Sequence, residues 1–157
     1  MNLQGNTSMR LNAEAGDGVF SGYAAVFERI DQGRDVIARG AFTRTLRERN
    51  ANSVKLLWQH DPKTPIGRVE LLREDEHGLF MRGRLSLEAM RGRDAHALLK
   101  TGALDGLSIG YRVRQAEADR MRSIRRLIDI DLWEVSVVTF PMQSAARVRA
   151  VKSATRK

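Results

Sequence analysis

A lone serine between two glycines is the residue best suited to covalent chemistry in this chain of 157 residues. In the stretch GLSIGY (106–111), an extended backbone points Ser108 and both glycines to one face and three larger apolar residues to the other. Glycine weakens a strand interior, so this spacing favours a bulge or the close approach of another backbone, such as a peptide substrate. From these six residues alone, a small polar residue on a solvated strand face is the more ordinary interpretation.

Two further polar residues lie in apolar stretches and suit the same chemistry. Glu134 lies in LWEVSVVTF (132–140), where alternation places it on one face with Leu132 and Ser136. If that face is core, the carboxylate needs a partner, because burying an unpaired charge is costly. The candidates are His60 and an arginine of the hairpin expected before this run. A neutral imidazole oriented by a carboxylate takes the proton of a serine hydroxyl in acyl transfer.

Each of these residues also has an ordinary explanation when taken alone. Glu134 fits a solvated sheet edge, and a lone histidine at a strand end is ordinary more often than catalytic. Three such residues on three separate strands are a less ordinary coincidence. The set Ser108, His60 and Glu134 therefore predicts a Ser-His-acid site.

The apolar pattern predicts the elements that must position these residues. A polar turn with Gly78 and an arginine-rich stretch at 112–126 indicate hairpins, Ser86 is a plausible helix N-cap, and Gly102 is a natural helix stop. About seven strands are expected at 19–27, 35–38, 54–60, 66–73, 79–85, from 106, and over 126–140, with helices at 41–50 and 87–101. The expected fold class is mostly β (α+β), an antiparallel β-barrel or sheet with a few helices packed outside. The absence of a βαβ rhythm and of a glycine-rich phosphate loop argues against nucleotide cofactors.

Length and composition set further limits. A chain of 157 residues with 42% hydrophobic content predicts one globular domain at 1–150, followed by a disordered basic tail at 151–157. There is no cysteine, which excludes disulfides and thiolate chemistry. Three histidines without a His-Glu-x-x-His helix argue against a metal hydrolase, so no metal or other cofactor is expected. No apolar run suits a bilayer span, and the first residues lack a signal pattern, so a cytosolic protein without membrane partners is expected.

The positive charge is concentrated at the C-terminus. The chain has 27 Lys and Arg against 19 Asp and Glu, a net charge of +8. Five of the positive charges lie in the last eleven residues, which leaves +3 for everything before them. Such a tail binds polyanions without specificity, whether nucleic acid or an acidic protein segment. Two tryptophans and two tyrosines do not provide the aromatic surface of a single-strand binder.

Six sequence blocks, in the same order, resemble those of the prohead maturation proteases of tailed bacteriophages with HK97-like capsids. The blocks are SGYAAVF (21–27), GAFTRTL (40–46), VKLLWQHD (54–61), PIG (65–67), GLSIGY (106–111) and LWEVSVVTFP (132–141). The resemblance implies that Ser108 is the nucleophile, His60 the general base, and Glu134 the acid that orients the histidine. It also implies a β-barrel fold similar to that of the herpesvirus assembly proteases.

The function that the resemblance implies is a serine endopeptidase of prohead maturation. Its substrate would be the scaffolding segment of the major capsid protein, with self-cleavage and a homo-oligomer as further expectations. It would act inside the assembling prohead in the host cytoplasm and meet nucleic acid only through the basic tail. The competing hypothesis is a catalytically silent capsid-assembly or polyanion-binding module on the same barrel. Such a module has no need for Ser108, His60 and Glu134, which argues against it.

Overall fold

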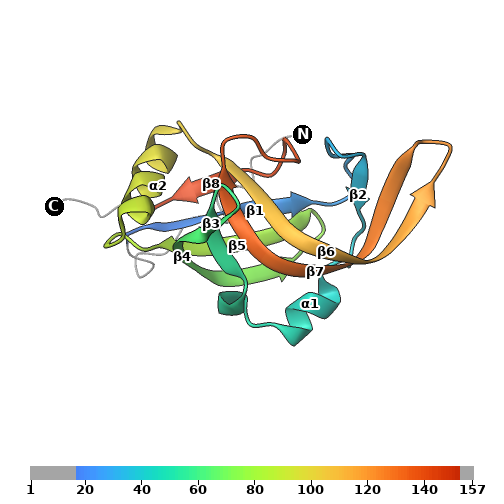
Figure 1. Ribbon diagram of the computed structural model, residues 1–157, viewed down its shortest axis with the longest axis horizontal. Coiled ribbons are helices and arrows are strands. Elements are labelled where there is room, and N and C mark those ends of the chain that lie inside the picture. Colours follow the sequence, from blue (N-terminus) through green and yellow to red (C-terminus); the bar gives the residue numbers. More distant parts are fainter. Residues whose placement is uncertain (1–16, 153–157) are drawn as a thin grey trace.

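One mixed sheet of eight strands organises residues 17–152, the part of the chain that this computed structural model describes (Figure 1). The strands are β1 (Val19–Val26), β2 (Asp35–Ile37), β3 (Lys55–Trp58), β4 (Asp61–Glu74), β5 (Gly78–Leu85), β6 (Gly106–Asp119), β7 (Ile124–Val138) and β8 (Val148–Val151). Their order is β2-β7-β3-β4-β5-β1-β8, and β6 pairs with the other edge of β7. The two longest strands, β6 and β7, form a hairpin that extends away from the rest of the sheet (Figure 1).

The predicted mostly β fold with a few helices is confirmed, but the strands are neither all antiparallel nor closed into a barrel. Both β2 and β3 run parallel to β7, whereas the other pairs are antiparallel. The sheet is open, since β8 is its end beyond β1 and β6, at the other side, pairs with β7 alone among the described strands. Alternating side chains reveal the faces of a strand and not the direction of its neighbour, and the long connections from β2 and β3 to β7 allow a parallel arrangement.

Two α-helices and one 3-10 turn complete the unit: α1 (Thr43–Glu48), α2 (Met90–Thr101) and η3 (Ala51–Ser53). The predicted N-cap at Ser86 is wrong, because the helix begins at Met90 with Ala89 as its cap. Ser86 instead extends the contact with β4, where its N–H donates to the Ile66 carbonyl (2.8 Å). The predicted stop is confirmed: Gly102 takes the left-handed conformation (φ 76°) that ends many helices. No helix within residues 17–152 is long and apolar enough to cross a membrane.

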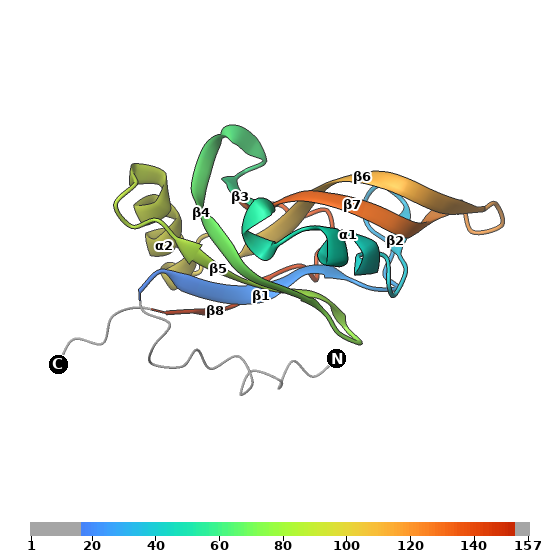
Figure 2. The same ribbon diagram turned by 90° about the horizontal axis from the view of Figure 1, so that it is seen from below.

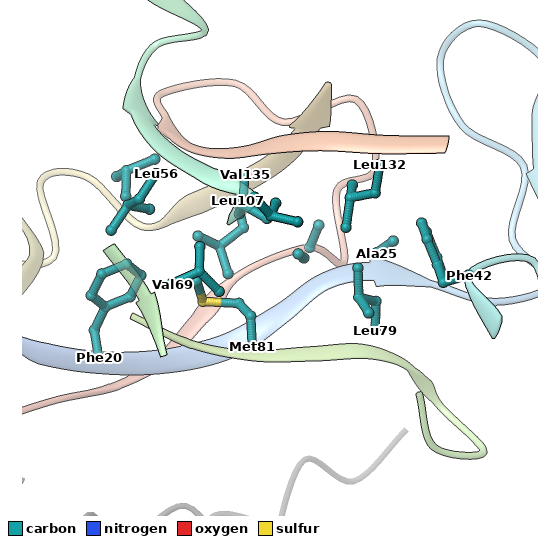
Figure 3. Packing of buried hydrophobic residues seen from close by; sticks show 14 of the residues in the cluster. Phe20, Ala25, Phe42, Leu56, Val69, Leu79, Met81, Leu107, Leu132 and Val135 are labelled. Atoms are coloured by element: carbon teal, nitrogen blue, oxygen red, sulfur yellow. The ribbon is translucent and has the colours of Figure 1, made fainter. Parts of the chain in front are cut away.

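The core lies between two parts of the same curved sheet. In Figure 2, β6 and β7 lie across from β1 and β5, and Figure 3 shows apolar side chains filling the space between them. Leu107 and Val135 come from the β6–β7 side, and Phe20 and Met81 come from β1 and β5; all four are fully buried. Each such side chain contributes about 1.5–3 kcal/mol of burial free energy. Packing across the curve, in addition to strand pairing, therefore holds β6 and β7 in place.

The segment expected as a tail from residue 151 begins within the sheet. Val151 is the last residue of β8 and pairs with Phe20 of β1. The next residue, Lys152, donates its N–H to the Val19 carbonyl (2.7 Å) and accepts the ring N–H of His96 on its own carbonyl (3.0 Å). The remaining positions of that expected tail, 153–157, lie outside the described residues.

Candidate active site

His60 lies in a two-residue turn that joins β3 to β4. Gln59 and His60 both have positive φ (50° and 61°), between the paired residues Trp58 and Asp61. Left-handed geometry at two positions is the hallmark of the tight hairpin turn that matches strand twist, although it costs non-glycine residues about 1 kcal/mol or more each. The prediction that the strand continues to His60 is therefore wrong, because the chain reverses after Trp58.

The turn is held against β7 by the residue that precedes the histidine. The backbone N–H of Gln59 donates to the Val137 carbonyl (3.0 Å). Its side-chain amide donates to the Thr139 hydroxyl (2.7 Å) and accepts the Thr139 backbone N–H (3.1 Å). These bonds continue the β3–β7 pairing beyond the end of β3, and they offset the strain of the turn. They therefore hold the turn, and His60 with it, next to β7.

The structure brings His60 and Glu134 together across 74 positions of sequence. Nδ1 of His60 lies 2.5 Å from Oε1 of Glu134, and the two side chains are 43% and 13% exposed. The hydrogen bond to this carboxylate, supported by its negative charge, raises the pKa of His60 above its ordinary value against the opposing effect of burial. Of the two partners foreseen for the carboxylate, it is the histidine and not an arginine that pairs with it. With Nδ1 engaged, Nε2 is the ring nitrogen left for proton transfer.

Ser136 is a residue of this site that sequence reasoning missed. Its hydroxyl donates to Oε2 of Glu134 (2.7 Å) and accepts the backbone N–H of His60 (3.0 Å). The side chain is fully buried. Ser136 therefore fixes both the carboxylate and the backbone of the turn. The only signal in the sequence was its position two residues after Glu134, on the same strand face.

Gly110 makes room for the carboxylate. It pairs with Glu134 across the β6–β7 ladder. An added Cβ at Gly110 would lie 2.6 Å from Cγ and 2.8 Å from Cδ of Glu134, and closer still to Oε1. The glycine spacing around Ser108 was interpreted as space for another backbone, but at this position the space is filled by the glutamate of the neighbouring strand. The ladder also shifts between Gly110 and Tyr111, which confirms a bulge there.

This bulge corrects one expectation about β7. Gly110 pairs with Glu134 but the next residue, Tyr111, pairs with Leu132, so Trp133 is the extra residue. Leu132 consequently lies in the core, on the opposite face from Glu134, although alternation had placed the two together. Core side chains lie on both sides of the bulge, at Leu132 before it and at Val135 after it, so the bulge exchanges the two faces of β7.

Ser108 lies on the same sheet face as the acid. It pairs with Ser136 in the β6–β7 ladder, two register positions from the Gly110–Glu134 pair, and is 5% exposed. Within residues 17–152 the Ser108 hydroxyl makes no hydrogen bond. The structure therefore pairs His60 with Glu134 directly, but it places Ser108 only next to Ser136, the residue that hydrogen-bonds both of them. Ser108 also lines a pocket that opens beside β6.

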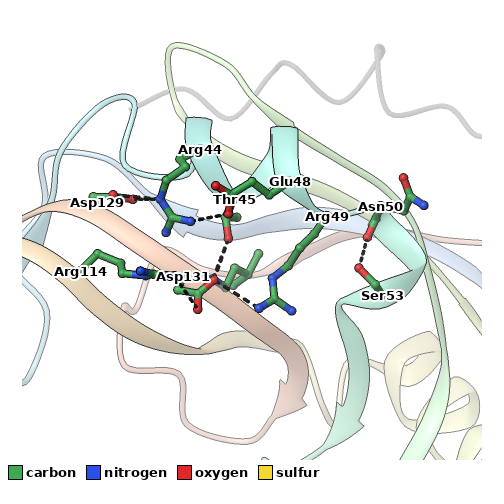
Figure 4. Close-up of polar contacts among 10 residues, drawn as sticks. Arg44, Thr45, Glu48, Arg49, Asn50, Ser53, Arg114, Asp129 and Asp131 are labelled. Carbon is green, nitrogen blue, oxygen red and sulfur yellow. Dashed lines mark hydrogen bonds and ion pairs between the residues drawn. The ribbon is translucent and has the colours of Figure 1, made fainter.

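A separate polar network fastens α1 to β7 next to the bulge (Figure 4). The buried carboxylate of Asp131 accepts hydrogen bonds from Thr45 and Arg49 (both 3.3 Å), and Arg114 lies 4.0 Å away. Arg49 also stacks on the ring of Trp133, 4.1 Å from its centroid. Because Trp133 is the bulged residue adjacent to Glu134, this network restrains the backbone that carries the acid. Among the described residues no cluster of three or more His, Asp and Glu could hold a metal ion.

A serine, a histidine and a carboxylate on one sheet face are the groups that acyl-transfer enzymes use. The fold gives the wider class. It resembles the bacteriophage T4 capsid assembly protease with a TM-score of 0.63 at 13% identity, over 78% of this chain and 82% of that one. It also resembles the KSHV protease in complex with a hexapeptide phosphonate inhibitor, with a TM-score of 0.57 at 14% identity, over 83% and 63% of the two chains. The fold is thus herpesvirus-protease-like.

The sequence identifies the family within that class. The sequence model of the caudovirus prohead serine proteases matches residues 6–157. The prohead protease of Enterobacteria phage HK97 is 32% identical over 149 residues, which is 94% of this chain. The chain therefore belongs to the caudovirus prohead serine protease family. It spans 66% of the length of the HK97 relative.

Proposed function

We propose that this chain is a serine endopeptidase in which Ser108 is the nucleophile, His60 the general base, and Glu134 the acid that orients the histidine. The observation that carries the proposal is the 2.5 Å bond between Nδ1 of His60 and Glu134, whose ladder partner Gly110 lies two residues from Ser108. This bond fixes the tautomer that leaves Nε2 unprotonated and able to accept a proton. Family membership supports the same assignment.

The reaction proceeds by acyl transfer. The Ser108 oxygen forms a bond to the peptide carbonyl carbon while its proton passes to Nε2 of His60. His60 then donates that proton to the leaving amine as the C–N bond breaks, and water hydrolyses the acyl-enzyme by the same route in reverse. The carboxylate of Glu134 stabilises the imidazolium formed in each half-reaction. A positioned general base is worth about 10²–10⁴-fold in rate.

We infer the substrate from the names of the relatives. The matched proteins are a prohead protease of phage HK97 and a capsid assembly protease of phage T4. The proposed substrate is accordingly the scaffolding segment of the major capsid protein, together with the protease itself. Cleavage would take place inside the assembling prohead in the host cytoplasm. Self-association and non-specific contact of nucleic acid with the basic C-terminal residues complete the proposed partners.

The experiment that tests the chemistry needs no substrate. Purified protein is treated with a fluorophosphonate probe, and the modified residue is mapped by mass spectrometry, with Ser108→Ala and His60→Ala as matched variants. We expect labelling of Ser108 in the wild type, none at that position in Ser108→Ala, and a loss of about 10²-fold or more in His60→Ala. Ser21→Ala is a control, because Ser21 is also buried on a strand but lies outside the site.

The catalytically silent module remains the second candidate function, and the positive charge favours testing it. Salt titration of binding to an acidic scaffold peptide separates the two, because polyanion binding weakens steeply with salt whereas covalent labelling of Ser108 does not depend on it. Removal of residues 153–157, which leaves β8 intact, isolates the contribution of the last basic residues. A folded wild type that binds the peptide but is not labelled, alone or in proheads, would refute the protease and support the module.

A further inference from the structure

The pocket beside Ser108 has a mixed lining. Its walls include apolar side chains from β1, β2 and β6, with Met142 and Ala146 from the loop after β7. Its polar lining residues are Asp31, Ser108, Tyr111 and Gln143. The enclosed space is about 30 Å³, room for one or two water molecules or the ammonium end of a side chain, with the remainder open to solvent. His60 and Glu134 do not line it.

The pocket opens at the edge of β6 that does not pair with β7. Among the described strands, β6 pairs only with β7, apart from an isolated bridge between Gly106 and Arg147. The Leu107 N–H donates across this second edge to the Ala146 carbonyl (2.8 Å). Period-two alternation turns the N–H and C=O of Ile109 to the same edge, where no strand covers them. A polypeptide can therefore approach Ser108 along this edge, with a side chain beside the pocket.

The polar groups of the pocket differ in how many of their hydrogen-bonding positions are already used. Both ends of the Gln143 amide bond the backbone of Val26 (2.8 and 2.9 Å). Oδ1 of Asp31 accepts the N–H groups of Gly33 and Asp35 (2.8 and 2.9 Å). Within residues 17–152, Oδ2 of Asp31 has no hydrogen bond and the carboxylate has no ion pair. Asp31 therefore presents a carboxylate oxygen that is free of hydrogen bonds and ion pairs among the described residues.

Arg125 is attracted to Asp31 as well as to Asp35, but its two hydrogen bonds go to Asp35. Asp35 is neutralised by a two-point ion pair with Arg125 (2.9 and 3.0 Å). Burial, followed by the negative charges of Asp35 and Asp31, raises the pKa of Tyr111, so its hydroxyl stays protonated at neutral pH. The pocket thus combines an apolar wall, a neutral hydroxyl and a carboxylate with one oxygen free of hydrogen bonds in the described part of the chain. This combination suits a side chain with an apolar stem and a positive end.

We propose that this pocket receives a basic side chain of the substrate residue whose carbonyl Ser108 attacks, and that Asp31 selects it. The inference rests on the proposed peptidase function and adds a substrate class to it. Ser108 lines the pocket itself, so the side chain that enters is the one attached to the attacked carbonyl. Met142, which is 47% exposed, contacts the apolar stem at the mouth, and the ammonium or guanidinium end meets Oδ2 of Asp31.

The test uses three peptidyl diphenyl phosphonates that differ only in the side chain beside phosphorus: lysine, uncharged norleucine and glutamate. In the covalent step the Ser108 oxygen bonds to phosphorus, one phenolate leaves, and His60 accepts the serine proton. We expect the lysine probe to label Ser108 about 10- to 100-fold faster than norleucine, the ratio that one charge-assisted hydrogen bond supports. The glutamate probe should be slowest.

Two isosteric variants isolate the carboxylate. Asp31→Asn keeps the oxygen that accepts the two turn N–H groups and removes the charge, so the lysine-to-norleucine ratio should fall towards one. Asp94→Asn removes the same charge from a residue of α2 that does not line the pocket, and should keep the wild-type ratio. The small fluorophosphonate, which has no side chain to select, should label Ser108 equally in all three proteins.

The possible outcomes separate the inference from the function on which it rests. Equal rates for lysine and norleucine in wild type, with normal fluorophosphonate labelling, overturn the basic specificity and leave the peptidase in place. A ratio that survives in Asp31→Asn assigns the selection to another residue and overturns the role of Asp31. Absence of fluorophosphonate labelling in wild type overturns the peptidase and the inference together.

Discussion

Substitution of Gly110 by alanine offers the most direct test of the site geometry. The new Cβ would overlap the glutamate, at 2.6 Å from Cγ and 2.8 Å from Cδ of Glu134. Because β6 and β7 are fixed by their ladder and by the core, the flexible side chain must move, and both carboxylate bonds, to His60 and Ser136, are lost. Overpacking of this kind costs about 1–3 kcal/mol of unfolding free energy. Loss of the orienting acid should slow labelling of Ser108 by about 10²–10⁴-fold.

The assay for this variant has two readouts. The rate of fluorophosphonate labelling reports reactivity, and an NMR titration of the His60 ring reports its pKa, which should fall from its raised value when the carboxylate leaves. Gly102→Ala is the matched control: its φ of 76° makes alanine cost about 1 kcal/mol, but no atom lies within 4 Å of the added Cβ. If Gly110→Ala labels and titrates like the wild type, the glycine is not there to accommodate the acid and the geometric reasoning is refuted.

Three further substitutions probe the surroundings of the same carboxylate. In Glu134→Gln the pKa of His60 should fall, because the amide oxygen can still accept a hydrogen bond but the negative charge that strengthens the bond and favours the imidazolium is lost. The acidic limb of the pH–rate profile then moves to lower pH, and the plateau drops about 10²–10⁴-fold. The stabilisation from the charged pair, which is present below the ordinary histidine pKa and lost as pH rises through the raised one, disappears as well. An unchanged profile would contradict the pairing. Ser136→Ala should slow labelling about 10- to 100-fold, because two partners lose their bonds, whereas Ser21→Ala, which removes a buried hydroxyl without a partner, should label normally. Asp131→Ala should lower the unfolding free energy in urea by about 1–3 kcal/mol, and a variant as stable as wild type would show that the network beside α1 is dispensable.

Several parts of this site could be predicted from the sequence because they depend on residue type and local spacing. Ser108, His60 and Glu134 stand out as polar residues in apolar strands, and period-two alternation correctly puts the serine on a face of β6 opposite Leu107. The stop at Gly102 follows from the same local chemistry, since glycine adopts positive φ without strain. These features need only neighbouring residues to be recognised.

Other parts depend on partners that lie far away along the chain. The parallel pairing of β3 with β7 lies beyond any local pattern, because alternation does not encode a neighbour's direction. The extra residue Trp133 inverted the expected orientation of Leu132, since one bulge exchanges the faces of everything beyond it. The turn at His60 was missed because its positive φ is stabilised from outside, by the bonds between Gln59 and β7.

The sequence by itself determined the kind of protein: a mostly β, cysteine-free member of the caudovirus prohead serine protease family, with Ser108, His60 and Glu134 as candidate catalytic residues. Only the tertiary structure decided how these groups meet. His60 bonds Glu134, which lies 74 positions away in the sequence. Ser136 hydrogen-bonds both residues, and Asp31 lines the same pocket as Ser108. The physical reason is that the residue type fixes which functional group a side chain carries. Its pKa, its orientation and the groups within hydrogen-bonding distance are set by neighbours that only the packed sheet supplies.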